Sequence, residues 1–68
     1  EAGDKLPEAV KNFELAISLE PKNSKYYLSL SNTYVKLGNA ERAKELLLTA
    51  QTFDPENELL KAKLKKYI

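Results

Sequence analysis

The sequence predicts an all-α protein of four helices packed as antiparallel pairs. Three observations indicate this class. Helix-favouring Leu, Ala, Lys and Glu are abundant, whereas only two Gly and three Pro occur among 68 residues. Apolar residues recur at helical spacing in four segments. Very short connections separate these segments, so neighbouring helices are expected to run antiparallel.

The first predicted helix begins near Pro7 and ends before Pro21. Proline suits a first helical turn, where backbone N–H groups lack helical partners, and Asp4 is placed to cap that turn. Pro21 ends the helix because it lacks an N–H group and restricts the residue before it. One apolar stripe is formed by Ala9, Val10, Phe13, Ala16 and Ile17.

The second helix is expected to start at Asn23 or Ser24, either of which can cap it, and to end at Gly38-Asn39. Glycine tolerates the left-handed conformation that helix ends favour. The stripe of this helix is Tyr27, Leu30, Ser31, Tyr34 and Leu37.

The third helix is expected to begin near Ala40 and to stop at Asp54-Pro55, and residues 57–68 are expected to form the fourth. The third helix carries the stripe Ala43, Leu46, Leu47 and Ala50. The fourth carries Leu60, Leu64 and Tyr67 or Ile68.

The chain contains an internal repeat, in which the first helix corresponds to the third and the second to the fourth. The alignment places Leu19-Glu20-Pro21 on Phe53-Asp54-Pro55 and Asn23 on Asn57. The matches keep size and polarity at helical spacing, which is typical of a helical repeat protein. The same alignment pairs Ala9 with Ala43, Phe13 with Leu47, Ala16 with Ala50, Leu30 with Leu64 and Tyr34 with Ile68.

This pattern resembles the tetratricopeptide repeat, a helix–turn–helix unit of about 34 residues. The signature residues here are Tyr27, Leu30, Ser31, Tyr34, Gly38, Ala43, Leu47, Ala50 and Pro55. The resemblance implies a right-handed superhelix of about two repeats in a single domain over residues 1–68. Residues 1–21 would be a half repeat, 22–55 a full repeat and 56–68 a C-terminal capping helix. Ser31, Ala43 and Ala50 would let paired helices approach closely.

The resemblance also implies a concave groove lined by the first helix of each repeat. The groove residues would be Lys25, Leu28, Asn32, Val35, Lys36 and Lys63. Some family members hold C-terminal carboxylates in a clamp of Lys, Asn and Arg. Asn32 and Lys63 match two clamp places, but Leu28, Ser29 and Leu59 occupy three others, so this clamp is not predicted.

The two ends of the chain differ. The last helix carries Lys61 and Lys65 where the family has a large aromatic and a small residue, which indicates a solvated capping helix and a true end of the array. The first helix lacks a preceding partner, so Phe13 and Ile17 would stand on an open edge. Either the array has been cut from something longer or another molecule fills the gap, and a second copy would do so.

Charge alternates along the chain. Residues 1–20 carry a net charge of −3, residues 21–40 +3, residues 41–58 −3 and residues 59–68 +4. With the family geometry, the basic segments line the groove and would attract an acidic peptide. The alternative interpretation is that these are ordinary solvated helix faces.

The composition disfavours several functions. There is no Cys and no His, and the carboxylates lack metal-ligand spacing, so neither a catalytic site nor a metal or cofactor is predicted. No apolar run is long enough to span a bilayer and no signal-peptide layout is visible, which leaves the cytoplasm as the default location.

We therefore expect a non-catalytic module or scaffold that binds a protein or peptide in its groove. Two alternatives remain open. One is a homo-oligomer in which a second copy completes the missing half repeat. The other is weak binding of nucleic acid or an anionic surface by the lysines of the last helix, which are few in a chain of net charge +1.

Overall fold

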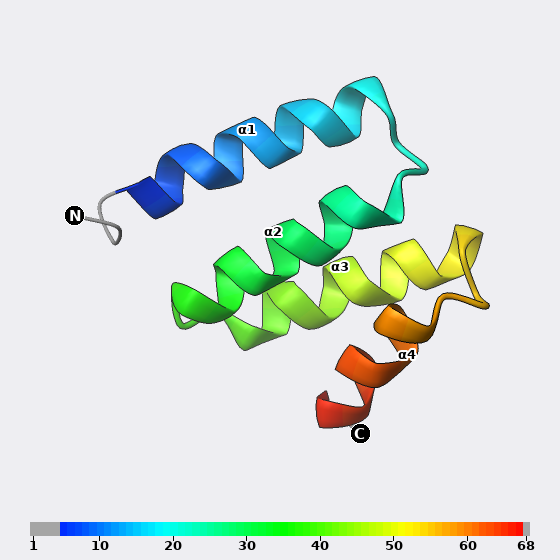
Figure 1. The fold of residues 1–68 in the computed structure, drawn as a ribbon. Coiled ribbons are helices and arrows are strands. Elements are labelled where there is room, and N and C mark those ends of the chain that lie inside the picture. The colour runs from blue at the N-terminus through cyan, green and yellow to red at the C-terminus, as the bar shows by residue number, and fades with distance from the viewer. Residues whose placement is uncertain (1–4, 68) are drawn as a thin grey trace.

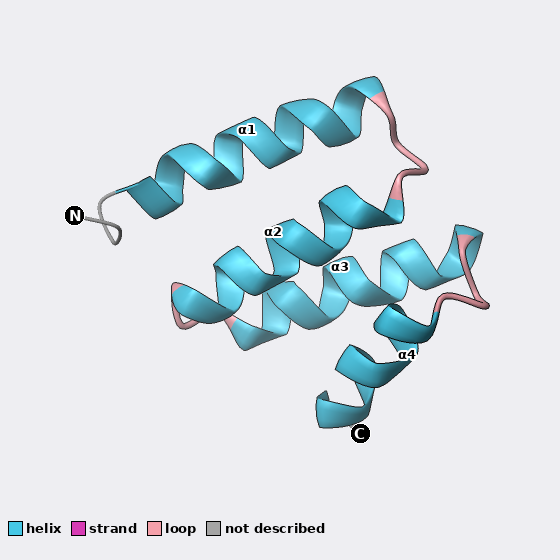
Figure 2. Cartoon of the chain, viewed as in Figure 1, coloured by secondary structure: helices cyan, strands magenta, loops and turns pink. Residues whose placement is uncertain are grey.

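The computed structural model describes residues 5–67, and these residues form four α-helices and one short 3-10 helix (Figures 1 and 2). The described residues contain no strand, so the all-α prediction is confirmed. The helices are α1 at Leu6–Leu19, α2 at Ser24–Lys36, α3 at Ala40–Phe53 and α4 at Glu58–Leu64, followed by η2 at Lys65–Tyr67.

The helices follow one another as an antiparallel series. In Figure 1 the chain runs from α1 at the top through α2 and α3 to α4 at the bottom, reversing direction at each turn. Helix α2 packs against both α1 and α3, and α4 packs against α3. This places α1 and α4 at the two ends of the molecule, which measures 35 × 28 × 15 Å along its principal axes.

An asparagine side chain caps each of the last three α-helices. The side-chain oxygens of Asn23, Asn39 and Asn57 accept hydrogen bonds of 2.9–3.2 Å from backbone N–H groups two or three residues later. These bonds satisfy donors that have no partner within the helix. Asn23, rather than Ser24, is therefore the cap of α2.

The structure corrects two other helix boundaries. Lys5 occupies the N-cap position of α1 without a side-chain bond, and the predicted cap, Asp4, lies outside the described residues. The fourth helix is α-helical only to Leu64 and continues as the 3-10 turn η2. Its predicted end at residue 68 also lies outside the described residues.

The corner between α2 and α3 depends on Gly38. Its φ angle of +83° lies in the left-handed region that glycine adopts without strain. A Cβ atom at this position would meet no other atom within 4 Å, so the backbone conformation alone requires glycine here.

The core lies among α2, α3 and α4. Its largest fully buried side chains are Leu30, Ser31, Leu47 and Leu60, and the small residues Ala43 and Ala50 are fully buried with them. Tyr27 of α2 meets Phe53 of α3 edge to face, with ring centres 5.3 Å apart. Of the other repeat-signature residues, Tyr34 is half-buried, and Gly38 and Pro55 lie in exposed turns.

Helix α1 is less well covered than its repeat counterpart α3. None of its fourteen residues is buried, whereas α3 buries three. The half-buried residues Ala9, Phe13 and Ala16 correspond to the buried residues Ala43, Leu47 and Ala50. The difference arises because α3 packs between α2 and α4, while α1 packs mainly on α2.

A candidate protein-binding groove

A small hollow between α2 and α4 gathers part of the predicted groove. We call it the α2–α4 hollow; its volume is about 100 Å³. Helix α2 contributes Ser31, Asn32 and Val35, α3 contributes Leu47, and the C-terminal segment contributes Lys63, Lys66 and Tyr67.

Lys63 and Asn32 connect the two sides of this hollow. The Lys63 ammonium group donates a hydrogen bond of 3.0 Å to the side-chain oxygen of Asn32, although the residues are 31 positions apart. A lysine ammonium group has three N–H donors, and this bond uses one of them. The Lys63 ammonium group therefore lies in the α2–α4 hollow, and its remaining N–H donors can bind an acceptor such as a carboxylate.

Val35 adds an apolar contact surface beside this charge, because about half of its surface is exposed. Asn32, Val35 and Lys63 are the predicted groove residues that the structure brings together. Lys25 and Lys36 are exposed near the two ends of α2 and do not line the hollow.

Leu28 departs from the predicted groove. It is only 8% exposed and belongs to the buried cluster that includes Leu60 and Leu64 of α4. Helix α4 packs over this part of α2 and turns a predicted binding residue into a core residue. An isolated helix pattern does not reveal this, because the burial depends on the next helix.

Sequence reasoning did not assign Lys66 to the groove, and it placed Tyr67 or Ile68 on the apolar stripe of the fourth helix. Lys66 and Tyr67 both line the hollow beside Lys63, and Tyr67 also packs against the core. Lys66 and Tyr67 follow Lys63 by three and four residues, and residues so spaced share one helix face. This spacing could have predicted that they line the groove with Lys63.

A second polar cluster fixes the starts of α2 and α4 relative to each other. The Ser24 hydroxyl donates to the Asp54 carboxylate at 2.7 Å, and the Asn57 amide donates to the same oxygen at 2.8 Å. The Asn57 amide also lies 3.2 Å from the Ser24 hydroxyl oxygen. The hydrogen bonds from Asn57 and then Ser24 lower the pKa of the Asp54 carboxyl below its usual value.

The predicted open-edge residues are both partly covered. Ile17 packs against the core cluster, and Phe13 is half-buried whereas its repeat counterpart Leu47 is fully buried, so self-association through this edge stays a prediction. The exposed apolar residues of α1 are Leu15 and Leu19 instead. Leu15 and Leu19 are each two residues from Ile17, so they lie on the opposite face of α1 from it.

No helix among residues 5–67 combines the length and apolar character needed to cross a membrane. Within the same residues, no group of three or more acidic side chains comes together in a way that could hold a metal ion.

Successive antiparallel helices of this kind, with the small residues Ser31, Ala43 and Ala50 buried between them, are typical of a helical repeat protein. The model of the tetratricopeptide repeat family matches residues 2–67, nearly the whole chain, and the chain belongs to this family. Tetratricopeptide repeats are in general non-catalytic modules for protein–protein interaction. Neither the search of curated proteins nor the search of solved structures gives a match.

Proposed function

We propose that the chain binds a short acidic peptide across the α2–α4 hollow. The observation that carries this proposal is the bond between Lys63 and Asn32, which sets a lysine ammonium group in a notch between two helices. Lys66 adds a second cation to the same hollow. An acidic side chain placed there would meet two ammonium groups and an amide.

Charge outside the hollow supports the same partner. Residues 21–40, which contain α2, carry +3, and residues 59–68, which begin after the first residue of α4, carry +4. Lys25 and Lys36 extend the positive charge to both ends of α2. A surface of one sign raises the association rate of an oppositely charged partner. Val35 would hold an apolar side chain of the peptide, since about half of its surface is open.

Fluorescence anisotropy with a dye-labelled peptide of Glu and Leu, blocked at both ends, would test the proposal. A matched peptide with Gln in place of each Glu tests the need for charge. We expect the acidic peptide to bind more tightly, and K63Q and K66Q each to weaken its binding about fivefold, the equivalent of ~1 kcal/mol per exposed charge pair. Added salt should weaken binding further.

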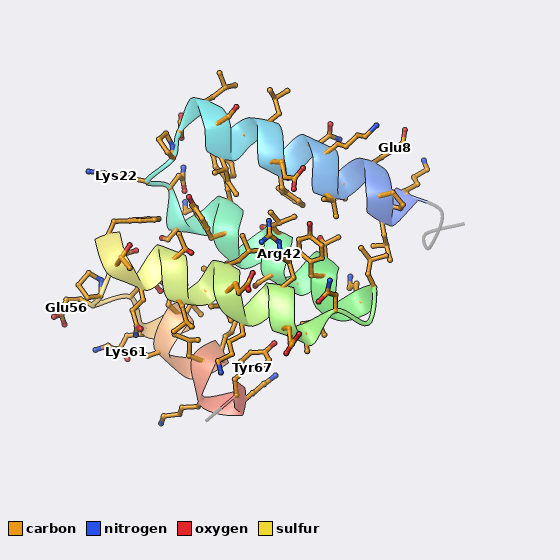
Figure 3. All side chains as sticks on the ribbon, turned by 180° about the vertical axis from the view of Figure 1, so that it is seen from behind. Glu8, Lys22, Arg42, Glu56, Lys61 and Tyr67 are labelled. Atoms are coloured by element: carbon orange, nitrogen blue, oxygen red, sulfur yellow. The ribbon has the colours of Figure 1, made fainter. Side chains whose placement is uncertain are left out.

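K22Q is the matched control, because Lys22 is exposed in the turn between α1 and α2 and does not line the hollow (Figure 3). It removes the same charge and should change affinity little. Equal binding of both peptides, or equal losses in K22Q and K63Q, would show that the hollow is not the binding site.

A further inference from the structure

A larger hollow lies at the other side of α4, between α4 and α3. We call it the α3–α4 hollow; its volume is about 300 Å³. Leu48 and Gln51 of α3 line one wall, and Lys61, Leu64 and Lys65 line the other. Figure 3 shows Lys61 and Tyr67, which also lines this hollow, at the end of the molecule away from Glu8 of α1.

The internal repeat identifies what kind of element fits this hollow. In the repeat alignment, Lys61, Leu64 and Lys65 fall on Tyr27, Leu30 and Ser31. Those three residues are buried on α2, which packs against α3, and Tyr27 contacts Phe53 there. The α4 wall of this hollow is therefore the repeat counterpart of the α2 surface on which α3 packs, with Lys61 and Lys65 in place of Tyr27 and Ser31. A helix of the α3 type placed there would contact Leu64 and meet the two lysines.

Helix α1 is such a helix, with the matching side uncovered. Its counterpart of Phe53 is Leu19, which is 75% exposed, whereas Phe53 is half-buried against Tyr27. Ala9, Phe13 and Ala16 correspond to the residues that α3 buries completely, yet they are only half-buried. The chain thus carries both the helix and the surface that the helix fits, at opposite ends.

Charge favours the same pairing. Residues 1–20 have a net charge of −3, and residues 59–68 have +4. Glu8 corresponds to Arg42, which lies over the Tyr34 ring near the end of α2. The corresponding end of the last segment carries Lys65 and Lys66, so α1 of another copy would bring an acid toward these lysines.

We propose that copies of this chain associate head to tail, with α1 of one copy docked in the α3–α4 hollow of the next. Such a contact joins two different surfaces, so it builds chains or rings rather than a two-fold dimer. The two hollows share Tyr67, and Lys66 lines the α2–α4 hollow, but Asn32 and Lys63 do not line the α3–α4 hollow.

Light scattering on the whole chain over a concentration series tests the association. We expect the average mass to rise with concentration. L48E places a negative charge in the hollow. L19K replaces an exposed apolar side chain of α1 with a positive charge. Both positions are exposed, so both variants should keep the wild-type helical circular dichroism, and each alone should weaken association about tenfold or more.

Mixing the two variants identifies the surfaces. L48E retains an intact α1, and L19K retains an intact hollow. A mixture should therefore form a one-to-one pair through a single restored contact, although neither variant associates alone. L59E is the matched control, because Leu59 is also an exposed leucine but does not line the hollow, and it should associate like the wild type.

Three results would overturn the proposal: a monomeric wild type at every concentration, unchanged association in L48E, or a mixture that fails to pair. The last of these, with both single variants defective, would instead indicate a symmetric contact. If K63Q loses peptide binding but self-associates like the wild type, then the peptide site and the contact between copies are distinct.

Discussion

Ser31 sits where α2 and α3 pack together, and it combines a small volume with a satisfied hydroxyl group. It is 2% exposed, and its hydroxyl donates a hydrogen bond of 2.8 Å to the backbone oxygen of Leu28. The side chain therefore occupies little space and leaves no unpaired polar group in the core. Among residues 5–67, no buried side-chain nitrogen or oxygen atom lacks a hydrogen-bond partner.

We expect S31L to destabilise the fold by about 1–3 kcal/mol, because extra carbon atoms in a packed core force neighbouring side chains apart. S18L is the matched control. Ser18 makes the same bond, to the backbone oxygen of Leu15 at 2.8 Å, but it is exposed. Urea unfolding of both variants checks this, and equal stabilities would mean that the crossing of α2 and α3 has room to spare.

Asp54 should make the free energy of unfolding depend on pH in the acidic range. Hydrogen bonds from Asn57 and Ser24 lower its pKa in the folded state. Its contribution is therefore present above the unfolded pKa of about 4 and is lost as the pH falls through the lower folded pKa. We expect the melting temperature of D54N to fall less than that of the wild type as the pH is lowered below about 4. An unchanged profile in D54N would assign the acid sensitivity to other carboxylates.

At the scale of elements, α1 and α3 are one repeat helix in two surroundings. The sequence treats them alike, since Phe13 and Leu47 occupy the same repeat position. Their surroundings in the structure differ, because Leu47 is fully buried and Phe13 is half-buried. The free energy that each helix contributes follows from its neighbours rather than from its own pattern.

We expect L47A to cost about 3 kcal/mol in unfolding free energy, and F13A about half of that. The sequence pattern alone predicts a cost of about 3 kcal/mol for F13A as well, as for an aromatic residue in a core. Partial exposure lowers this value because less apolar surface leaves water on folding. Chemical denaturation at a fixed low concentration avoids any contribution from self-association. A larger loss in F13A than in L47A would contradict the burial difference.

At the scale of the whole molecule, the two ends are complementary rather than equivalent. One end presents an acidic helix with exposed Leu15 and Leu19, and the other presents a basic hollow beside Leu48. A single chain cannot bring its own ends together, because α2 and α3 lie between α1 and α4. We therefore expect the average mass in solution, measured by light scattering, to rise with concentration.

Local features of the amino-acid sequence were enough to predict the helical class, the internal repeat, the turns at Pro21, Gly38 and Pro55, and the family. These follow from local periodicity, from backbone rules for proline and glycine, and from repeated residue types. The family resemblance, rather than local periodicity, was the basis for placing Asn32, Val35 and Lys63 in one groove.

Which surfaces remain open depends instead on contacts between helices. Leu28 lies in the core because α4 covers it, Ile17 packs inward, and Lys66 and Tyr67 join the groove through η2. The polar cluster of Ser24, Asp54 and Asn57 also joins residues about thirty positions apart. Burial is a property of neighbouring elements, so a pattern within one helix indicates an apolar face but not what covers it.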